Sequence, residues 1–103
     1  MPELKLVWVV PEEALDATRG AVFDAGAGRI GEYERCSWYT AGTGTFQGAE
    51  GTSPAVGESG REERTPEVRV ETVVPAERAD DVIAALVEAH PYEEVAYDLY
   101  PLA

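Results

Sequence analysis

Two segments of the chain, 64 residues apart, follow the same pattern: Leu4-Lys5-Leu6-Val7-Trp8-Val9-Val10-Pro11-Glu12-Glu13 and Val68-Arg69-Val70-Glu71-Thr72-Val73-Val74-Pro75-Ala76-Glu77. Each copy begins with a run rich in β-branched apolar residues, which is typical of a buried strand. Each then has a proline and an acidic residue, which favour the first turn of a helix. Aligned without a gap, residues 4–33 and 68–97 are identical at eight of thirty positions. The chain is therefore predicted to contain two matching strand–helix–strand halves.

The first half is predicted to form a central strand at residues 4–10, a helix at 14–25 and a strand at 31–39. The second half is predicted to form a strand at residues 68–74, a helix from Pro75 and Glu77 to His90, and a strand at 95–100. Two such halves joined through a hairpin give the βαββαβ order of the ferredoxin-like fold, in the α+β class. Right-handed crossovers place both helices on one face of a four-stranded antiparallel sheet.

The opposite face of this sheet has no helix to cover it. Five aromatic residues lie on the expected strands and are available to that face: Trp8, Tyr33, Trp38, Tyr39 and Tyr97. An uncovered aromatic face is expected to bury itself against other subunits.

The middle of the chain has the composition of a loop. All ten glycines lie between Gly20 and Gly60. Residues 40–65 are therefore predicted to form a glycine-rich hairpin loop, with residues 43–46 as a candidate strand. Loops of this length in a small domain are usually functional, so this one is a candidate binding surface for a protein partner.

Length and charge exclude several classes of protein. The chain has 103 residues, which fits a single domain over residues 1–103, and 20 acidic against 8 basic side chains give a net charge of −12. This charge disfavours binding to nucleic acids and to anionic membrane surfaces. The lone cysteine, Cys36, excludes an internal disulfide and a multi-cysteine zinc site. No signal or membrane segment is predicted, and a cytoplasmic location is expected.

Two motifs in the first half have simple structural explanations. Gly26-Ala27-Gly28-Arg29-Ile30-Gly31 matches G-x-G-x-x-G. The dinucleotide site needs a strand before the glycines and a helix after them, and here the order is reversed, so a helix end and a tight turn are predicted. Cys36 has no histidine near it in the sequence, so a small interior residue is favoured over a nucleophile.

The segment His90-Pro91-Tyr92-Glu93-Glu94 holds the densest cluster of chemically active side chains. His90, Glu93 and Glu94 offer nitrogen and oxygen ligands for a divalent metal ion, and Pro91 breaks the helix so that the three could converge. Alternatively, His90 interacts with the dipole at the end of the helix while Tyr92 packs. The sequence leaves both interpretations open.

Several segments, in this order, resemble the PII/CutA-like insert domain of the Nif-three-like family: Gly28-Arg29-Ile30-Gly31-Glu32-Tyr33, Cys36-Ser37, Gly42-Thr43-Gly44-Thr45-Phe46, Pro54-Ala55-Val56-Gly57, Glu67-Val68-Arg69-Val70-Glu71 and His90-Pro91-Tyr92-Glu93-Glu94-Val95-Ala96-Tyr97-Asp98. The resemblance covers nearly the whole chain and implies a ferredoxin-like fold that associates as trimers. It departs from the family pattern at Val95, where proline is common, and at Gln47-Gly48, where a basic residue and proline are common. The family's two-metal domain has no counterpart here, so its hydrolase assignments are not carried over.

We therefore expect a non-enzymatic cytoplasmic oligomer, a homotrimer, that binds a divalent metal ion or another small ligand at a cleft between subunits. Analogy with CutA suggests metals and analogy with PII suggests small anionic effectors; the net charge favours a cation. Two other classes stay open. One is an assembly module without a ligand, which recognises a protein through residues 40–65. The other is an enzyme in which Cys36, His90 and Glu93 meet between subunits.

Overall fold

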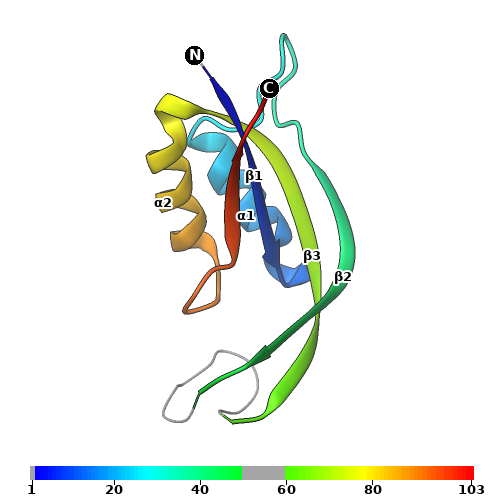
Figure 1. Ribbon diagram of the computed structural model, residues 1–103. Helices are drawn as coiled ribbons and strands as arrows, with labels where there is room; N and C mark the ends of the chain where they lie inside the picture. Colours follow the sequence, from blue (N-terminus) through cyan, green and yellow to red (C-terminus); the bar gives the residue numbers. More distant parts are fainter. Residues whose placement is uncertain (1, 50–59) are drawn as a thin grey trace.

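The computed structural model describes residues 2–49 and 60–103. Its elements are β1 (Glu3–Val10), α1 (Leu15–Asp24), β2 (Trp38–Gln47), β3 (Glu62–Pro75), α2 (Ala79–Ala89) and β4 (Tyr97–Pro101). The strands form one antiparallel sheet in the order β2-β3-β1-β4, and both helices lie on one face of it (Figure 1), which confirms the predicted ferredoxin-like fold. No helix among the described residues is long and apolar enough to cross a membrane.

The internal repeat is visible in how each helix begins. Pro11 and Pro75 have nearly the same extended conformation, with φ of −63° and −61°. Each is followed by a short 3-10 turn, Glu12–Ala14 and Ala76–Arg78, and then by the helix proper. Corresponding turns and helices therefore start 64 residues apart, as the alignment of the two halves predicts.

The strand predicted at residues 31–39 is wrong, because β2 begins only at Trp38. The backbone is left-handed at Gly28, Gly31 and Arg35, with φ of 86°, 59° and 56°, and an extended strand cannot contain such residues. Residues 28–36 instead form a short turn structure that projects from one end of the sheet, which we call the projecting hairpin (Figure 1).

Much of the segment predicted as loop, residues 40–65, is strand. β2 and β3 pair continuously from Trp38 opposite Glu71 to Gln47 opposite Glu62. β1 stops pairing with β3 at Val68, so residues 42–47 and 62–67 extend beyond the body as a two-stranded ribbon, which we call the arm (Figure 1). The β-branched threonines at alternate positions favour this extended backbone and offset the glycines between them. Residues 50–59 of the predicted loop lie outside the described residues.

The core lies between the sheet and the two helices. Trp8 is its largest side chain, only 1% exposed, and its indole Nε1–H donates to Thr18 Oγ1 of α1 at 3.1 Å. Strand side chains alternate between the two faces, so the partners of Trp8 across β3 and β4, Val70 and Tyr97, share its helix side. The other buried apolar side chains of this core are Leu6, Val10, Leu15, Val22, Phe23, Ala27, Val68, Val74, Val82 and Leu86.

The face without helices, here called the open face, carries a different set of aromatic residues from the predicted one. Strand register places Trp38 of β2 and Tyr100 of β4 on it, 59% and 48% exposed. Trp8, Tyr39 and Tyr97 lie on the helix side, and Tyr33 lies in the projecting hairpin. Of the five aromatics available to this face from the sequence, only Trp38 belongs there. Tyr33 falls outside β2, which starts later than predicted, and the pairing of the strands sets the faces of Trp8, Tyr39 and Tyr97.

Candidate functional site

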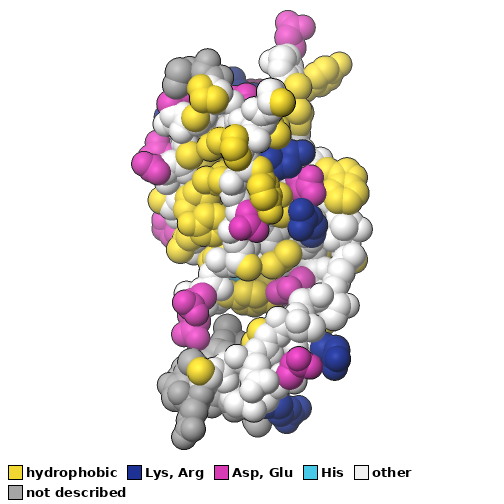
Figure 2. All heavy atoms as spheres, in the orientation of Figure 1, with side chains coloured by type: hydrophobic (Ala, Val, Ile, Leu, Met, Phe, Trp, Pro, Cys, Tyr) yellow, Lys and Arg dark blue, Asp and Glu magenta, His cyan; other side chains and the backbone are white. Residues whose placement is uncertain are grey.

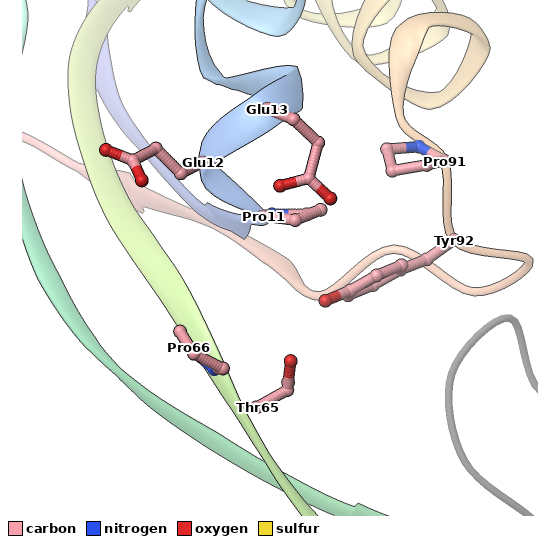
Figure 3. A pocket seen from close by; sticks show the side chains of 7 residues that line it. All are labelled: Pro11, Glu12, Glu13, Thr65, Pro66, Pro91 and Tyr92. Carbon is pink, nitrogen blue, oxygen red and sulfur yellow. The ribbon is translucent and has the colours of Figure 1, made fainter.

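A pocket of about 510 Å³ lies where the arm leaves the body of the domain (Figure 3). Its walls come from three separate segments: the start of the first helical turn, the arm portion of β3 and the chain after α2. The lining residues are Pro11, Glu12, Glu13, Thr65, Pro66, Pro91 and Tyr92. Three prolines and a tyrosine ring give the pocket rigid apolar walls, and two carboxylates supply its charge.

His90 ends α2 and supports one wall of this pocket. The side chain is buried, with 6% exposed. Its Nδ1 accepts a hydrogen bond from the Tyr92 backbone N–H at 3.2 Å, so the ring proton lies on Nε2, which donates to the Val9 carbonyl oxygen at 2.7 Å. Both ring nitrogens are therefore engaged, and the imidazole links the end of α2 to β1.

Tyr92 continues this connection to the arm. Its hydroxyl donates to Glu67 Oε2 at 2.7 Å, and its ring packs against the His90 ring with centroids 4.8 Å apart. Burial raises the pKa of the Tyr92 phenol, and the hydrogen bond to Glu67 and the negative charges of Glu67 and Glu13 raise it further. A chain of hydrogen bonds thus runs from Val9 through His90 and Tyr92 to Glu67.

The pocket is negatively charged. Its lining contains no lysine or arginine. Within residues 2–49 and 60–103, no ion pair is found for Glu12, Glu13 or Glu67. In Figure 3 the Glu13 carboxylate points into the space between Pro91 and the Tyr92 ring. These groups attract a cation and repel phosphate or carboxylate ligands.

The three predicted metal ligands differ in how exposed they are to solvent. His90 is buried, whereas Glu93 and Glu94 are exposed on the turn that follows. The part of the chain that the structure describes contains no group of three or more His, Cys, Asp or Glu side chains arranged to hold a metal ion. Metal binding through His90, Glu93 and Glu94 stays a prediction, and it would require His90 to give up one of its hydrogen bonds.

Sequence reasoning did not find the roles of Glu67 and Glu13 in this site. Glu67 lies 25 residues from Tyr92, and the charged residues around it suggest only a solvated loop. Glu13 recurs as Glu77 in the second half, which indicates a helix start rather than a pocket wall. The arm lies close to Tyr92 only because β3 continues beyond the end of β1.

The glycine motif forms the predicted helix end and turn, whereas Cys36 is not the interior strand residue that was predicted. Gly26, Gly28 and Gly31 all have positive φ and follow the end of α1 rather than preceding a helix. Cys36 is half-buried, its N–H donates to the Gly28 carbonyl at 2.8 Å, and its own carbonyl accepts from Thr72 Oγ1 at 2.6 Å. The backbone of Cys36 therefore fastens the base of the projecting hairpin to β3.

Tyr92→Phe is expected to lower the free energy of unfolding by about 1 kcal/mol at neutral pH, because the hydrogen bond to Glu67 is lost. The folded state raises the pKa of this phenol above its ordinary value of about 10. Its stabilising effect is therefore complete below pH ~10 and is lost as the pH rises further, since only the unfolded chain then releases the proton. Urea unfolding from neutral to alkaline pH measures the difference between wild type and variant, which should shrink above pH ~10.

The control for this variant is Tyr33→Phe, at a side chain that is 76% exposed. It should leave the free energy of unfolding unchanged at every pH. A stability difference for Tyr92→Phe that stays constant through the alkaline range would contradict the assigned hydrogen bond.

Comparison with known proteins supports the assignment of this fold. No protein-family model matches the chain. A "GTP cyclohydrolase 1 type 2 homolog" from Mycobacterium tuberculosis is 53% identical over 98 residues, which are 95% of this chain and 26% of that protein. The crystal structure of a Bacillus cereus protein related to NIF3 is 48% identical with a TM-score of 0.86, over 98% of this chain and 26% of that one.

CutA1 from Shewanella shares the fold at 14% identity, with a TM-score of 0.73 over 98% of this chain and 81% of CutA1. This neighbour matches over most of its length, whereas the chain spans about a quarter of the length of the NIF3-related proteins. The chain therefore corresponds to one segment, about a quarter of the length, of NIF3-related proteins, and this segment has the fold of CutA.

Proposed function

We propose that this domain is a self-associating module that buries its open face against further copies of itself, as the homotrimer that the family resemblance implies. The observation that carries the proposal is the aromatic surface of this face. Trp38 and Tyr100, 59% and 48% exposed, lie on the outer strands β2 and β4, with no helix above them. Large apolar side chains of this kind become stabilising when a partner removes them from water.

Charge also favours this face for contact between identical chains. Two copies with a net charge of −12 repel each other unless the touching surfaces are close to neutral. Around Val7 on the open face, Lys5 and Arg69 balance Glu71 and Asp98. Glu71 pairs with both cations, Lys5 Nζ at 3.5 Å and Arg69 Nε at 3.2 Å. The centre of the open face therefore carries little net charge.

The edge strand β2 also offers main-chain N–H and C=O groups for pairing with another copy. It is an edge strand of ten residues, Trp38–Gln47, and its sequence contains no charged residue. Edge strands that stay monomeric usually carry charges or prolines that prevent pairing. An uncharged edge of this length is suited to pairing with a strand of another copy.

Removing the aromatic side chains of the open face is expected to dissociate the oligomer. In the Trp38→Ser/Tyr100→Ser double variant, light scattering should give the mass of one chain at micromolar concentration, where the wild type gives a multiple of it. The control is Tyr39→Ser, because Tyr39 is 50% exposed but lies on the helix side of the same strand. A wild type that stays monomeric at micromolar concentration, or a control that dissociates equally, would refute self-association through this face.

A second function, favoured by the acidic pocket, is binding of a small organic cation. Pro11, Pro91 and the Tyr92 ring can pack against an aliphatic or planar stem, and Glu12 and Glu13 can bind an ammonium or guanidinium group. The volume of about 510 Å³ is within the range of small-molecule sites. This pocket lies within one chain, whereas the ligand site predicted from the sequence lies at a cleft between subunits.

Calorimetry with spermidine tests this second function. We expect Glu13→Gln to weaken binding about tenfold, because one carboxylate that faces the Tyr92 ring is lost. Glu77→Gln is the matched control, since Glu77 has the same position in the second half but does not line the pocket. Titration with Zn²⁺ of the wild type and of Glu93→Gln/Glu94→Gln tests the predicted metal site separately. Equal binding of spermidine by both single variants would exclude the pocket.

We further propose that the domain by itself is not catalytic. The name of the relatives refers to a cyclohydrolase homolog, but the chain spans only about a quarter of their length. Within the described residues, His90 and Tyr92 use their polar atoms in hydrogen bonds that hold the fold together. Their geometry supports a structural role for both side chains.

A further inference from the structure

The projecting hairpin, residues 28–36, has a rigid base. The Gly28 N–H donates to the Val73 carbonyl at 2.8 Å, the Cys36 N–H donates to the Gly28 carbonyl at 2.8 Å, and Thr72 Oγ1 donates to the Cys36 carbonyl at 2.6 Å. These bonds fix both ends of the hairpin to β3. The hairpin is thus held in one orientation relative to the sheet.

The tip of the hairpin is equally well defined. Ile30 and Tyr33 exchange two backbone hydrogen bonds, of 3.0 and 2.9 Å, and Gly31 between them has the positive φ that such a tight turn needs. Yet the side chains of Ile30 and Tyr33 are 54% and 76% exposed. Figure 2 shows hydrophobic side chains standing out from the body at this end of the molecule. The structure therefore holds two large apolar side chains in water on an ordered support, which is unfavourable unless something covers them.

The base of the hairpin also presents an unpaired cation. Arg35 lies over the Phe23 ring, with its guanidinium carbon 5.0 Å from the ring centroid. Among residues 2–49 and 60–103 it is the only lysine or arginine without an ion-pair partner. In a chain with a net charge of −12, a free guanidinium beside an apolar tip is suited to an acidic group on a partner.

The position of the chain ends indicates which partner this is. Glu3 pairs with Pro75 of β3, and the Leu102 N–H donates to the Glu3 carbonyl at 3.1 Å, so the two ends of the chain lie together. The hairpin is fastened to β3 at Thr72 and Val73, close to the same end (Figure 1). In the NIF3-related relatives the matching segment is only 26% of the protein, so the rest of each relative joins this segment at the end where the hairpin projects.

We propose that the projecting hairpin is a docking element for the folded domain that adjoins this segment in the NIF3-related relatives. Ile30 and Tyr33 enter an apolar socket on that domain, and Arg35 pairs with a carboxylate at the rim of the socket. The hairpin thereby fixes the orientation of the PII/CutA-like domain relative to its neighbour. This contact is separate from the open face, which lies on the sheet and serves self-association.

The test places this chain in the full-length Mycobacterium tuberculosis relative, in exchange for the segment that is 53% identical to it. Hydroxyl-radical footprinting then compares labelling of Tyr33 in the chimera and in the separate chain at low concentration. We expect labelling of Tyr33 to fall about fivefold in the chimera, because a side chain that is 76% exposed becomes the centre of an interface.

Two variants of the chimera make the test specific. Ile30→Asp should restore Tyr33 labelling to the level of the separate chain, since a charge cannot enter the apolar socket. Val87→Asp, at an apolar residue of α2 that is 47% exposed, should leave Tyr33 protected. If the chimera does not fold, the same labelling of the corresponding hairpin is compared between the natural relative and its excised segment.

Two results would overturn the proposal. One is equal labelling of Tyr33 in the separate chain and in the folded chimera. The other is protection of Tyr33 in the separate chain that increases with protein concentration, which would assign the hairpin to contacts between copies of this chain.

Discussion

Replacing Trp8 with alanine is expected to lower the free energy of unfolding by about 3–5 kcal/mol, the usual cost of removing a large aromatic side chain from a core. Trp8 is 1% exposed and lies between the sheet and α1. Its loss also leaves Thr18 Oγ1 without the indole donor at 3.1 Å. Since whole domains are stable by about 5–15 kcal/mol, this variant should be largely unfolded at moderate urea concentrations.

Urea unfolding followed by far-ultraviolet circular dichroism measures this effect. Trp8→Phe is the matched control, because it keeps an aromatic ring in the core and loses the indole N–H and a smaller part of the apolar contact, and we expect it to cost about 1–2 kcal/mol. Both variants should be compared at equal protein concentration, because self-association adds to apparent stability. A cost below about 1 kcal/mol for Trp8→Ala would show that this side chain does not lie in the core.

Gly28→Ala is expected to cost about 2–4 kcal/mol. The φ of Gly28 is +86°, which is strained for any residue with a Cβ atom. A Cβ here would lie 2.6 Å from Cδ1 and 2.7 Å from Cε1 of Phe23. Phe23 is a core residue, 8% exposed, and the guanidinium carbons of Arg19 and Arg35 lie 5.4 and 5.0 Å from its ring centroid, so it cannot move aside without disturbing the core.

Gly31→Ala separates backbone strain from steric clash. Gly31 also has a positive φ, of +59°, but a Cβ built there has no neighbour within 4 Å. We expect it to cost about 1 kcal/mol, from the left-handed conformation alone. Urea unfolding of both variants measures the difference, and equal costs would mean that Phe23 yields freely to the added methyl group.

Only part of the candidate site could be predicted from the sequence. In the segment that begins at His90, a histidine before a proline at a helix end is visible as a sequence pattern, and Pro91 and Tyr92 of this segment line the pocket. The contacts of this segment were not visible, since they come from Val9, 81 positions away, and Glu67, 25 positions away. The same holds for the pocket, whose three walls meet only because the arm continues past the end of β1.

The βαββαβ order, the two helix starts and the reversed role of the glycine motif could be predicted from the sequence, because proline placement and apolar periodicity act over a few residues and the internal repeat shows the pattern twice. The start of β2 and the aromatic residues of the open face could not be predicted, because both depend on how the strands pair. A strand's register depends on its partner across the sheet, and a shift of a single residue turns every side chain to the other face. The projecting hairpin lies where the repeat fails: after α2 the chain reaches Pro91 two residues past the helix end, whereas four residues of positive φ between α1 and β2 turn the chain outward.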